Sequence, residues 1–183
     1  MNTPEKIVSV YLRLNGFFTL NNFTHLPETG HSMESDMIAI RCPNSVEKVD
    51  EKNLQIDDKF FESGDLNKNE VIGLIVEIRG GSSSSQFNQT TKTEKKIEYA
   101  KNFFGDFKDK VYLCDVCDSY NEPCKNGNII EIGIKYIAKE VKSIINERGV
   151  ICNKQNSWYL NEGLLSDLIY LEKEGLLSAE KKK

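Results

Sequence analysis

The first apolar pattern of the chain has helical spacing. Its hydrophobic positions recur three and four residues apart, as in the buried stripe of a helix: Ile7, Val8, Tyr11 and Leu14. Thr3-Pro4-Glu5 supplies an N-cap, a proline suited to the first helical position and an acid that favours the helix dipole. Gly16 is suited to the helix end. The pattern therefore predicts a helix between Thr3 and Gly16.

Three stretches of the first half predict strands. Residues 17–25 suit a first strand, and Asp36 to Arg41 form a short apolar run that Pro43 ends. Val71 to Ile78 is apolar on both faces until its C-terminal end, which favours a central strand covered on both sides. There Glu77 and Arg79 stand two positions apart, and therefore on the same face of the strand.

The second half alternates helical and strand patterns. A helix is expected from Thr93 to Gly105, strands at 111–116 and 129–132, a helix from about Tyr136 to Arg148, and a last helix at 161–175. Residues 44–70 are polar and acidic, so we expect an excursion from the core with a short helical or extended piece at Phe60-Phe61. This order predicts an α/β fold, with a mixed central sheet flanked by helices.

Composition narrows the class of protein. With 183 residues, 39% of them hydrophobic and 28% charged, the chain suits one globular domain over 1–178, with a disordered tail at 179–183. No apolar run approaches the roughly 20 residues of a membrane helix, and the N-terminus does not suit a secretory signal. We therefore expect a cytoplasmic protein that does not bind membranes.

The net charge of −4 argues against strong DNA binding by charge alone. Residues 46–70 contain eight acids and four bases and account for this excess. The rest of the chain is near neutral, so its charge is compatible with a local basic surface.

Five cysteines in a chain without a secretory signal fit reduced thiols. Cys114, Cys117 and Cys124 have a spacing that invites a zinc site, with Cys152, His25 or His31 as a fourth ligand. The alternative is that they are buried or incidental thiols, since Cys114 falls within an apolar strand pattern.

The charges at the end of the Val71–Ile78 strand need an explanation, because a buried charge requires a partner, a metal or water. Glu77 and Arg79 could neutralise each other. Alternatively, if the strand that begins at Asp36 pairs with this one, Asp36 and Glu77 lie side by side. Two close carboxylates repel unless a cation lies between them, and oxygen ligands of this kind suit Mg²⁺.

Here the sequence resembles a family. The stretches "PEKIVSVYLRLNGFF", "MESDMIAIR" and "LIVEIRGG" are similar to the motifs of the PD-(D/E)XK nuclease superfamily, in its Holliday-junction-resolvase-like branch. The resemblance implies a restriction-endonuclease-like core of α-β-β-β-α-β order with C-terminal helices. It also implies a DNA-cleaving enzyme that uses Mg²⁺ or Mn²⁺. A homodimer, or a protein partner in a repair or defence system, is compatible with the resemblance.

The resemblance assigns roles to individual residues. Asp36, Glu77 and the carbonyl of Ile78 match the metal ligands, and Glu5 matches the helix acid that supports them, although it would equally serve the helix dipole. Glu34 matches an accessory acid or is a loop charge. Arg79 stands where the motif has lysine; a guanidinium can stabilise negative charge but stays protonated and cannot act as a base.

The lysines after the Gly/Ser-rich loop are candidate phosphate contacts. Lys92, Lys95 and Lys96 lie near a helix that borders the substrate groove in this fold, where they would bind DNA without reading its sequence. A solvated helix face, balanced by Glu94 and Glu98, is the alternative. The competing hypothesis for the whole protein is a catalytically degenerate nuclease fold that binds nucleic acid or protein, which the substitution at Arg79 favours.

Overall fold

One six-stranded mixed sheet organises the chain. The structure is a computed structural model, and it describes residues 3–25, 33–46, 48–49, 52–53, 56–80, 94, 97–98 and 101–147. The elements are, in chain order, α1 (Thr3–Leu14), β1 (Phe17–His25), β2 (Met33–Arg41), β3 (Lys48–Val49), β4 (Lys52–Asn53), α2 (Asp58–Ser63), β5 (Ile72–Arg79), a 3₁₀ helix (Gly105–Lys110), β6 (Val111–Cys117), β7 (Cys124–Asn126), β8 (Ile129–Gly133) and α4 (Ile134–Glu147).

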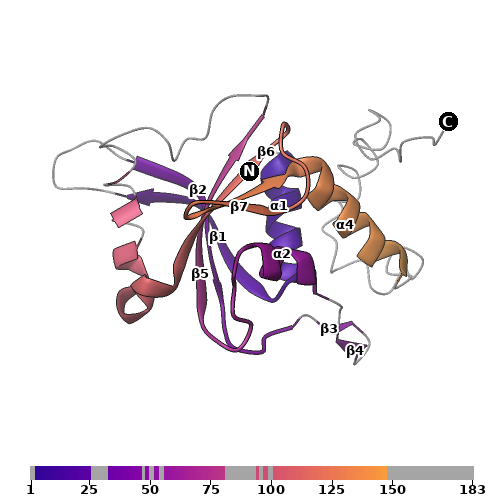
Figure 1. The fold of residues 1–183 in the computed structure, drawn as a ribbon, viewed down its shortest axis with the longest axis horizontal. Helices are drawn as coiled ribbons and strands as arrows, with labels where there is room; N and C mark the ends of the chain where they lie inside the picture. Colours follow the sequence, from indigo (N-terminus) through magenta and orange to yellow (C-terminus); the bar gives the residue numbers. More distant parts are fainter. Residues whose placement is uncertain are drawn as a thin grey trace.

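The strand order in the sheet is β1-β2-β5-β6-β8-β7. β5 is antiparallel to β2 and parallel to β6, and β6 is in turn parallel to β8. The outer pairs, β1 with β2 and β7 with β8, are antiparallel. The sequence prediction of an α/β fold with a mixed sheet between helices is confirmed at this level (Figure 1).

The two faces of the sheet carry two separate cores. The larger core packs α1, α2 and α4 against one face, which we call the α1 face, and these three helices lie together on one side of the sheet in Figure 1. The smaller core on the opposite face comprises Ile38, Ile75, Phe104 and Val111, with Ile97 packed against it. The residues described as helical between 94 and 103 precede this Phe104 contact. β5 is therefore covered on both sides, as its apolar pattern predicted.

The predicted first helix and its end are confirmed. α1 buries Ile7, Val8, Tyr11 and Leu12. Gly16 follows it with φ +84°, and a Cβ at this position would lie 2.3 Å from the carbonyl oxygen of Ser45. Both the left-handed backbone and the close approach of residue 45 therefore require glycine at this turn.

The expectation that residues 44–70 have few core anchors is wrong for α2. Phe60 and Phe61 are 0% and 1% exposed; Phe60 meets Tyr11 edge to face and Phe61 stacks on Phe17 in the larger core. The sequence pointed correctly to a short helical piece here, but the acidic composition around it concealed how deeply that piece is buried.

Asp57 fastens this helix to the rest of the α1 face. Its carboxylate accepts hydrogen bonds from the hydroxyls of Tyr11, at 2.6 Å, and Tyr136, at 3.0 Å, and it caps α2 by accepting from the Phe60 backbone N–H. Burial and the charge of Asp57 raise the pKa of Tyr11 well above its usual value, so this phenol remains a donor. One carboxylate therefore joins α1, α2 and α4.

Some predicted segments lie outside the described residues, namely the helix at 161–175 and the tail at 179–183. Among the residues that the structure does describe, no helix is both long and apolar enough to span a membrane.

Replacing Asp57 by alanine should lower the free energy of unfolding by about 3 kcal/mol, because it removes a helix cap and leaves two buried hydroxyls without an acceptor. Asp58→Ala is the matched control, since Asp58 is exposed and its pair with Lys68 lies at the surface. That change should cost less than about 1 kcal/mol. Urea unfolding measures both, and equal losses would contradict the structural role of Asp57.

Candidate functional site

Asp36 and Glu77 belong to neighbouring strands and to the same face of the sheet. The β2–β5 register pairs Met37 with Val76, and one further step places Asp36 opposite Glu77. Residues directly opposite each other on antiparallel strands project to the same face. Because Met37 and Val76 belong to the α1 face, Asp36 and Glu77 belong to the other face, with Ile38 and Ile75.

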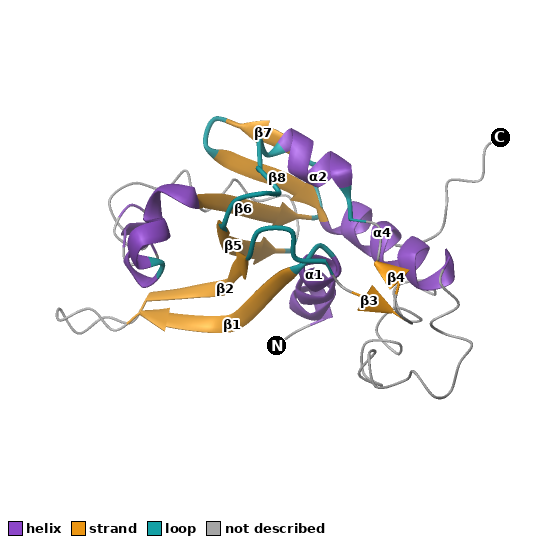
Figure 2. Ribbon diagram, turned by 90° about the horizontal axis from the view of Figure 1, so that it is seen from below, coloured by secondary structure: helices purple, strands orange, loops and turns teal. Residues whose placement is uncertain are grey.

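The sheet opens between β2 and β5 at this level. Pairing of β2 with β5 ends at Met37, whereas its pairing with β1 continues to Met33 (Figure 2). The β1–β2 ladder itself is interrupted at Asn22, which has φ 51° and faces Asp36 across the two strands. Asp36 therefore lies where the ladders of β2 with both of its neighbours are interrupted.

The Asp36 carboxylate takes the place of a backbone acceptor. Its Oδ2 accepts a hydrogen bond from the backbone N–H of Ile78, at 2.7 Å. In an antiparallel strand the N–H and C=O of one residue point to the same neighbouring strand. The Ile78 carbonyl is therefore directed toward β2 as well, the side on which Asp36 lies. Glu77, which precedes Ile78 and lies opposite Asp36, is only 3% exposed.

Arg79 is held by a partner that the sequence did not indicate. Its Nε and Nη2 donate to the two oxygens of Asp115 on β6, at 3.1 and 2.5 Å, and both side chains are almost fully buried. Burial alone would lower the pKa of Arg79, but the hydrogen bonds and charge of Asp115 outweigh it and raise that pKa. Arg79 therefore remains a cation with one edge of its guanidinium committed to Asp115.

Tyr120 completes this cluster. Its hydroxyl donates to Asp115 Oδ2 at 3.3 Å and lies 3.5 Å from Arg79 Nη2, from which it accepts. Burial and the Asp115 charge raise the pKa of Tyr120. The cluster therefore fixes the end of β5 to β6 and to the turn that follows β6.

The parallel registers extend the acids into a row. Glu77 pairs with Asp115, and Asp115 pairs with Glu131 on β8, where Asn126 donates to the Glu131 carboxylate at 2.9 Å. Asp36, Glu77, Asp115 and Glu131 thus cross four neighbouring strands at one level. Sequence reasoning missed Asp115 and Glu131. The signal available was one acid within each apolar strand, "VYLCDVC" and "IIEIG", but only the register shows that they align.

The other predicted site residues do not join Asp36 and Glu77 within the described part of the chain. Glu5 lies in the first turn of α1, on the α1 face, whereas Asp36 and Glu77 belong to the opposite face. Glu34 lies within β2 and is exposed, so it is not a loop charge. Lys92, Lys95 and Lys96 lie outside the described residues.

Within the described residues, Cys114, Cys117 and Cys124 do not form a zinc site of the kind that their spacing invited. Cys114 belongs to the α1-face core, and Cys117, three residues later on the same strand, projects to the opposite face. Burial raises the pKa of the Cys114 thiol, which opposes the thiolate that zinc requires. Cys42 and Cys124 are exposed thiols, and Cys152 lies outside the described residues.

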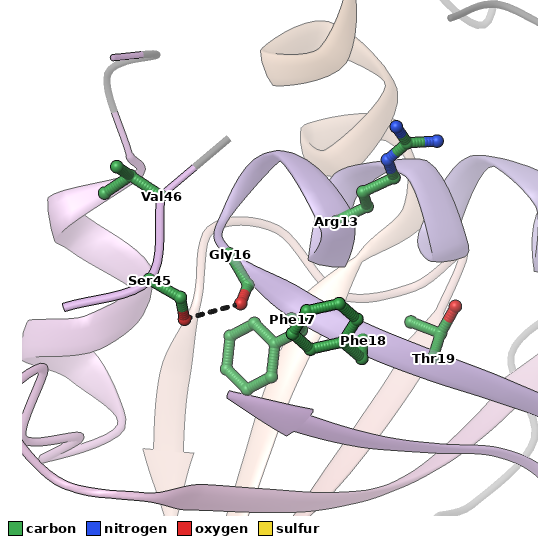
Figure 3. A pocket seen from close by; sticks show the side chains of 7 residues that line it. All are labelled: Arg13, Gly16, Phe17, Phe18, Thr19, Ser45 and Val46. Carbon is green, nitrogen blue, oxygen red and sulfur yellow. Dashed lines mark hydrogen bonds between the residues drawn. The ribbon is translucent and has the colours of Figure 1, made fainter. Parts of the chain in front are cut away.

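A separate cavity of about 330 Å³ lies at the C-terminal end of α1, with Arg13, Gly16 and Ser45 in its wall (Figure 3). The start of β1 also lines it, and Phe17 pairs with Arg41 at the opposite end of β2 from Asp36. It therefore does not extend the row of acids. Among the described residues, no group of three or more histidine, cysteine or acidic side chains has a geometry that could hold a metal ion.

Comparison of the chain with protein-family models, curated proteins and solved structures found no match.

Removing Asp115 should destabilise the protein strongly, because it leaves the buried Arg79 guanidinium without its carboxylate. We expect Asp115→Ala to lower the free energy of unfolding by about 3 to 5 kcal/mol. Tyr120→Phe should cost about 1 kcal/mol, since the two hydrogen bonds that it removes, to Asp115 and from Arg79, are both long. The double variant Arg79→Leu/Asp115→Leu should recover most of the loss, and chemical unfolding of all three variants tests this coupling. A loss in the double variant as large as that in Asp115→Ala would contradict it.

Proposed function

We propose that this protein is a metal-dependent nuclease that hydrolyses DNA phosphodiester bonds, with Mg²⁺ or Mn²⁺ held by Asp36, Glu77 and the carbonyl of Ile78. The observation that carries the proposal is the position of Asp36 opposite Glu77, where β2 and β5 separate. The hydrogen bond from Ile78 N–H to Asp36 supports the proposal. Because the N–H and the carbonyl of Ile78 point to the same side of β5, this carbonyl is also directed toward Asp36. Two carboxylates and a carbonyl are hard oxygen ligands of the kind that Mg²⁺ prefers.

The charge balance of the face also favours a cation. Four acids, Asp36, Glu77, Asp115 and Glu131, share one level of the sheet, and Arg79 lies two residues further along β5. A phosphodiester approaching such a face would be repelled unless a divalent ion reduced its negative charge. Bound between Asp36 and Glu77, the ion would supply an activated water and polarise the phosphate.

The residues of the chain would then perform separate tasks. Asp36 and Glu77 fix the position of the ion from two strands, and the Ile78 backbone orients the Asp36 carboxylate. Asp115 and Tyr120 restrain Arg79 at the end of β5, so that its charge is available as a fixed field and not as a mobile contact. As an arginine it removes no proton from water, and the general base must come from elsewhere.

The order of the elements supports a restriction-endonuclease-like core. That core requires α-β-β-β-α-β, and α1, β1, β2, β5, the helical residues between 94 and 103, and β6 follow one another in this order once the segment 42–71 is set aside. The helix of that segment, α2, packs on the α1 face, away from Glu77. The acids of this helix, Asp58 and Glu62, therefore do not cover the proposed site.

A second candidate is a nucleic-acid or protein-binding module in which the nuclease chemistry has been lost. The buried pair of Arg79 with Asp115 favours it, because the side chain at the motif-lysine position has become part of the structure. In this case Asp36 and Glu77 would be retained without a catalytic ion.

The nuclease proposal predicts metal-dependent cleavage of supercoiled and branched DNA that depends on both acids. Asp36→Asn and Glu77→Gln should each reduce the rate about a hundredfold or more, because each removes a charged ligand. They should also weaken Mn²⁺ binding, measured by titration calorimetry without DNA. Glu62→Gln, an exposed acid on α2, is the control and should change neither quantity.

The two candidates give different outcomes. DNA binding that is indifferent to Mg²⁺, with no cleavage and no Mn²⁺ binding, would reject the nuclease and favour the module. Cleavage that persists in Glu77→Gln would place the activity at another site. Gain of cleavage in Arg79→Lys, accompanied by Mn²⁺ binding in the unaltered protein, would show a metal site that lacks only its lysine.

A further inference from the structure

The two edges of the sheet differ in how they are protected. Exposed strand edges present unpaired backbone groups, and proteins usually blunt them with short strands, charges or bulges. β7 follows this rule, because it has three residues and includes Lys125. β1 does not: it has nine residues, "FFTLNNFTH", and none of them is aspartate, glutamate, lysine or arginine.

β1 is the outermost strand, as Figure 2 shows, and within the described part of the chain it pairs on one side only, with β2. The regular part of this pairing runs from Phe17 to Asn21, before the left-handed Asn22 interrupts it. This leaves about five regularly paired, uncharged residues at the outer edge of the sheet.

An apolar surface adjoins this edge. Phe18 and Leu20 are 68% and 49% exposed, and they project to the face opposite α1, because Phe17 and Thr19 between them contact the α1 side. Phe103, 57% exposed, lines the same shallow depression together with Phe18 and Leu20. We call these three residues the edge patch.

A partner for the edge patch must provide an extended, uncharged strand whose alternate side chains are apolar on one face. β1 itself has this pattern. In an antiparallel pair of two β1 strands with a two-fold axis near Thr19, Phe18 of one copy lies beside Leu20 of the other, and both contacts fall on the same face. The edge is therefore complementary to a second copy of itself.

The surface is large enough for an association of modest strength. The edge patch exposes roughly 300 Å² per chain, given about 200 Å² for a phenylalanine side chain. Two copies would bury at most about 600 Å² of side chain, because side chains on paired strands keep their outer surface exposed. With the two strand edges, the upper limit is close to the roughly 1,000 Å² of a weak specific interface. Pairing would also satisfy the outward backbone groups of both strands.

We infer that the chain forms a homodimer through antiparallel pairing of β1 with β1 of a second copy, with the edge patches in contact across the two-fold axis. The dimer joins two six-stranded sheets into one and pairs the edge that β1 leaves unpaired within the described residues. The short, charged β7 at the other edge of each copy stops further addition, so the assembly closes at two.

Sedimentation velocity over about 1 to 200 μM tests the proposal with the full chain. We expect a dimer that dissociates in the micromolar range, as its modest area implies. Leu20→Lys should raise the dissociation constant at least tenfold, because the two-fold axis brings each substitution into the interface twice. Leu20 is half exposed, so the melting temperature should change little, which separates loss of pairing from loss of folding.

The control and the register check are specific. Asn128→Lys adds the same charge in the exposed turn beyond β7 and should leave the dimer intact. Under mild oxidation, mixing the Phe18→Cys and Leu20→Cys proteins should give a disulfide between residues 18 and 20 of different chains, identified by mass spectrometry. A protein that is monomeric at 200 μM, or a dimer that resists Leu20→Lys, would overturn the proposal without affecting the nuclease assay.

Discussion

The register of β5 against its two neighbours is the constraint on which the rest of the structure depends. The antiparallel ladder with β2 sets Asp36 opposite Glu77, and the parallel ladder with β6 sets Asp115 beside Glu77. A slip of one residue in either ladder would move one set of acids to the α1 face and the apolar residues of the larger core out of it. The burial of Leu74 and Val76 on that face therefore holds the acids in line on the other.

The pair of Arg79 with Asp115 explains why a strand buried on both faces tolerates charge at its end. A fully buried carboxylate such as Asp115 is costly unless it is paired and hydrogen-bonded, and here it receives two donors from Arg79 and one from Tyr120. The same geometry limits what Arg79 can do chemically. A lysine would not form this two-pronged contact, so the arginine stabilises β5 against β6 through a shape that lysine lacks.

Periodicity predicted the elements because local burial patterns decide them. β1 was expected at 17–25 and is found there, and the strong apolar run that predicted β5 begins and ends within one residue of the strand. The alignment of Asp36 with Glu77 was also expected, from one assumption about pairing. Asp115 and Glu131 were missed, because each is a lone acid whose meaning depends on strand register across the sheet, which no local pattern records. The burial of α2 was missed for the opposite reason, since a strongly acidic local composition outweighed two adjacent phenylalanines.

The break in the β1–β2 ladder at Asn22 separates the residues that the two proposals use. Residues 17–21, which precede Asn22, offer a regularly paired edge for a second copy. At the level of Asn22, Asp36 leaves the ladder and faces Glu77. In the proposed dimer the two acidic sites would lie on the same face of one continuous sheet. Strand spacing and rise place them roughly 25 to 30 Å apart, on either side of the two-fold axis. The two strands of duplex DNA are related by two-fold axes of their own, so a symmetric dimer of this kind would present one site to each strand. Pairing through the uncharged edge would then place the two acidic rows to act on the two strands of one duplex, although each proposal can be tested alone.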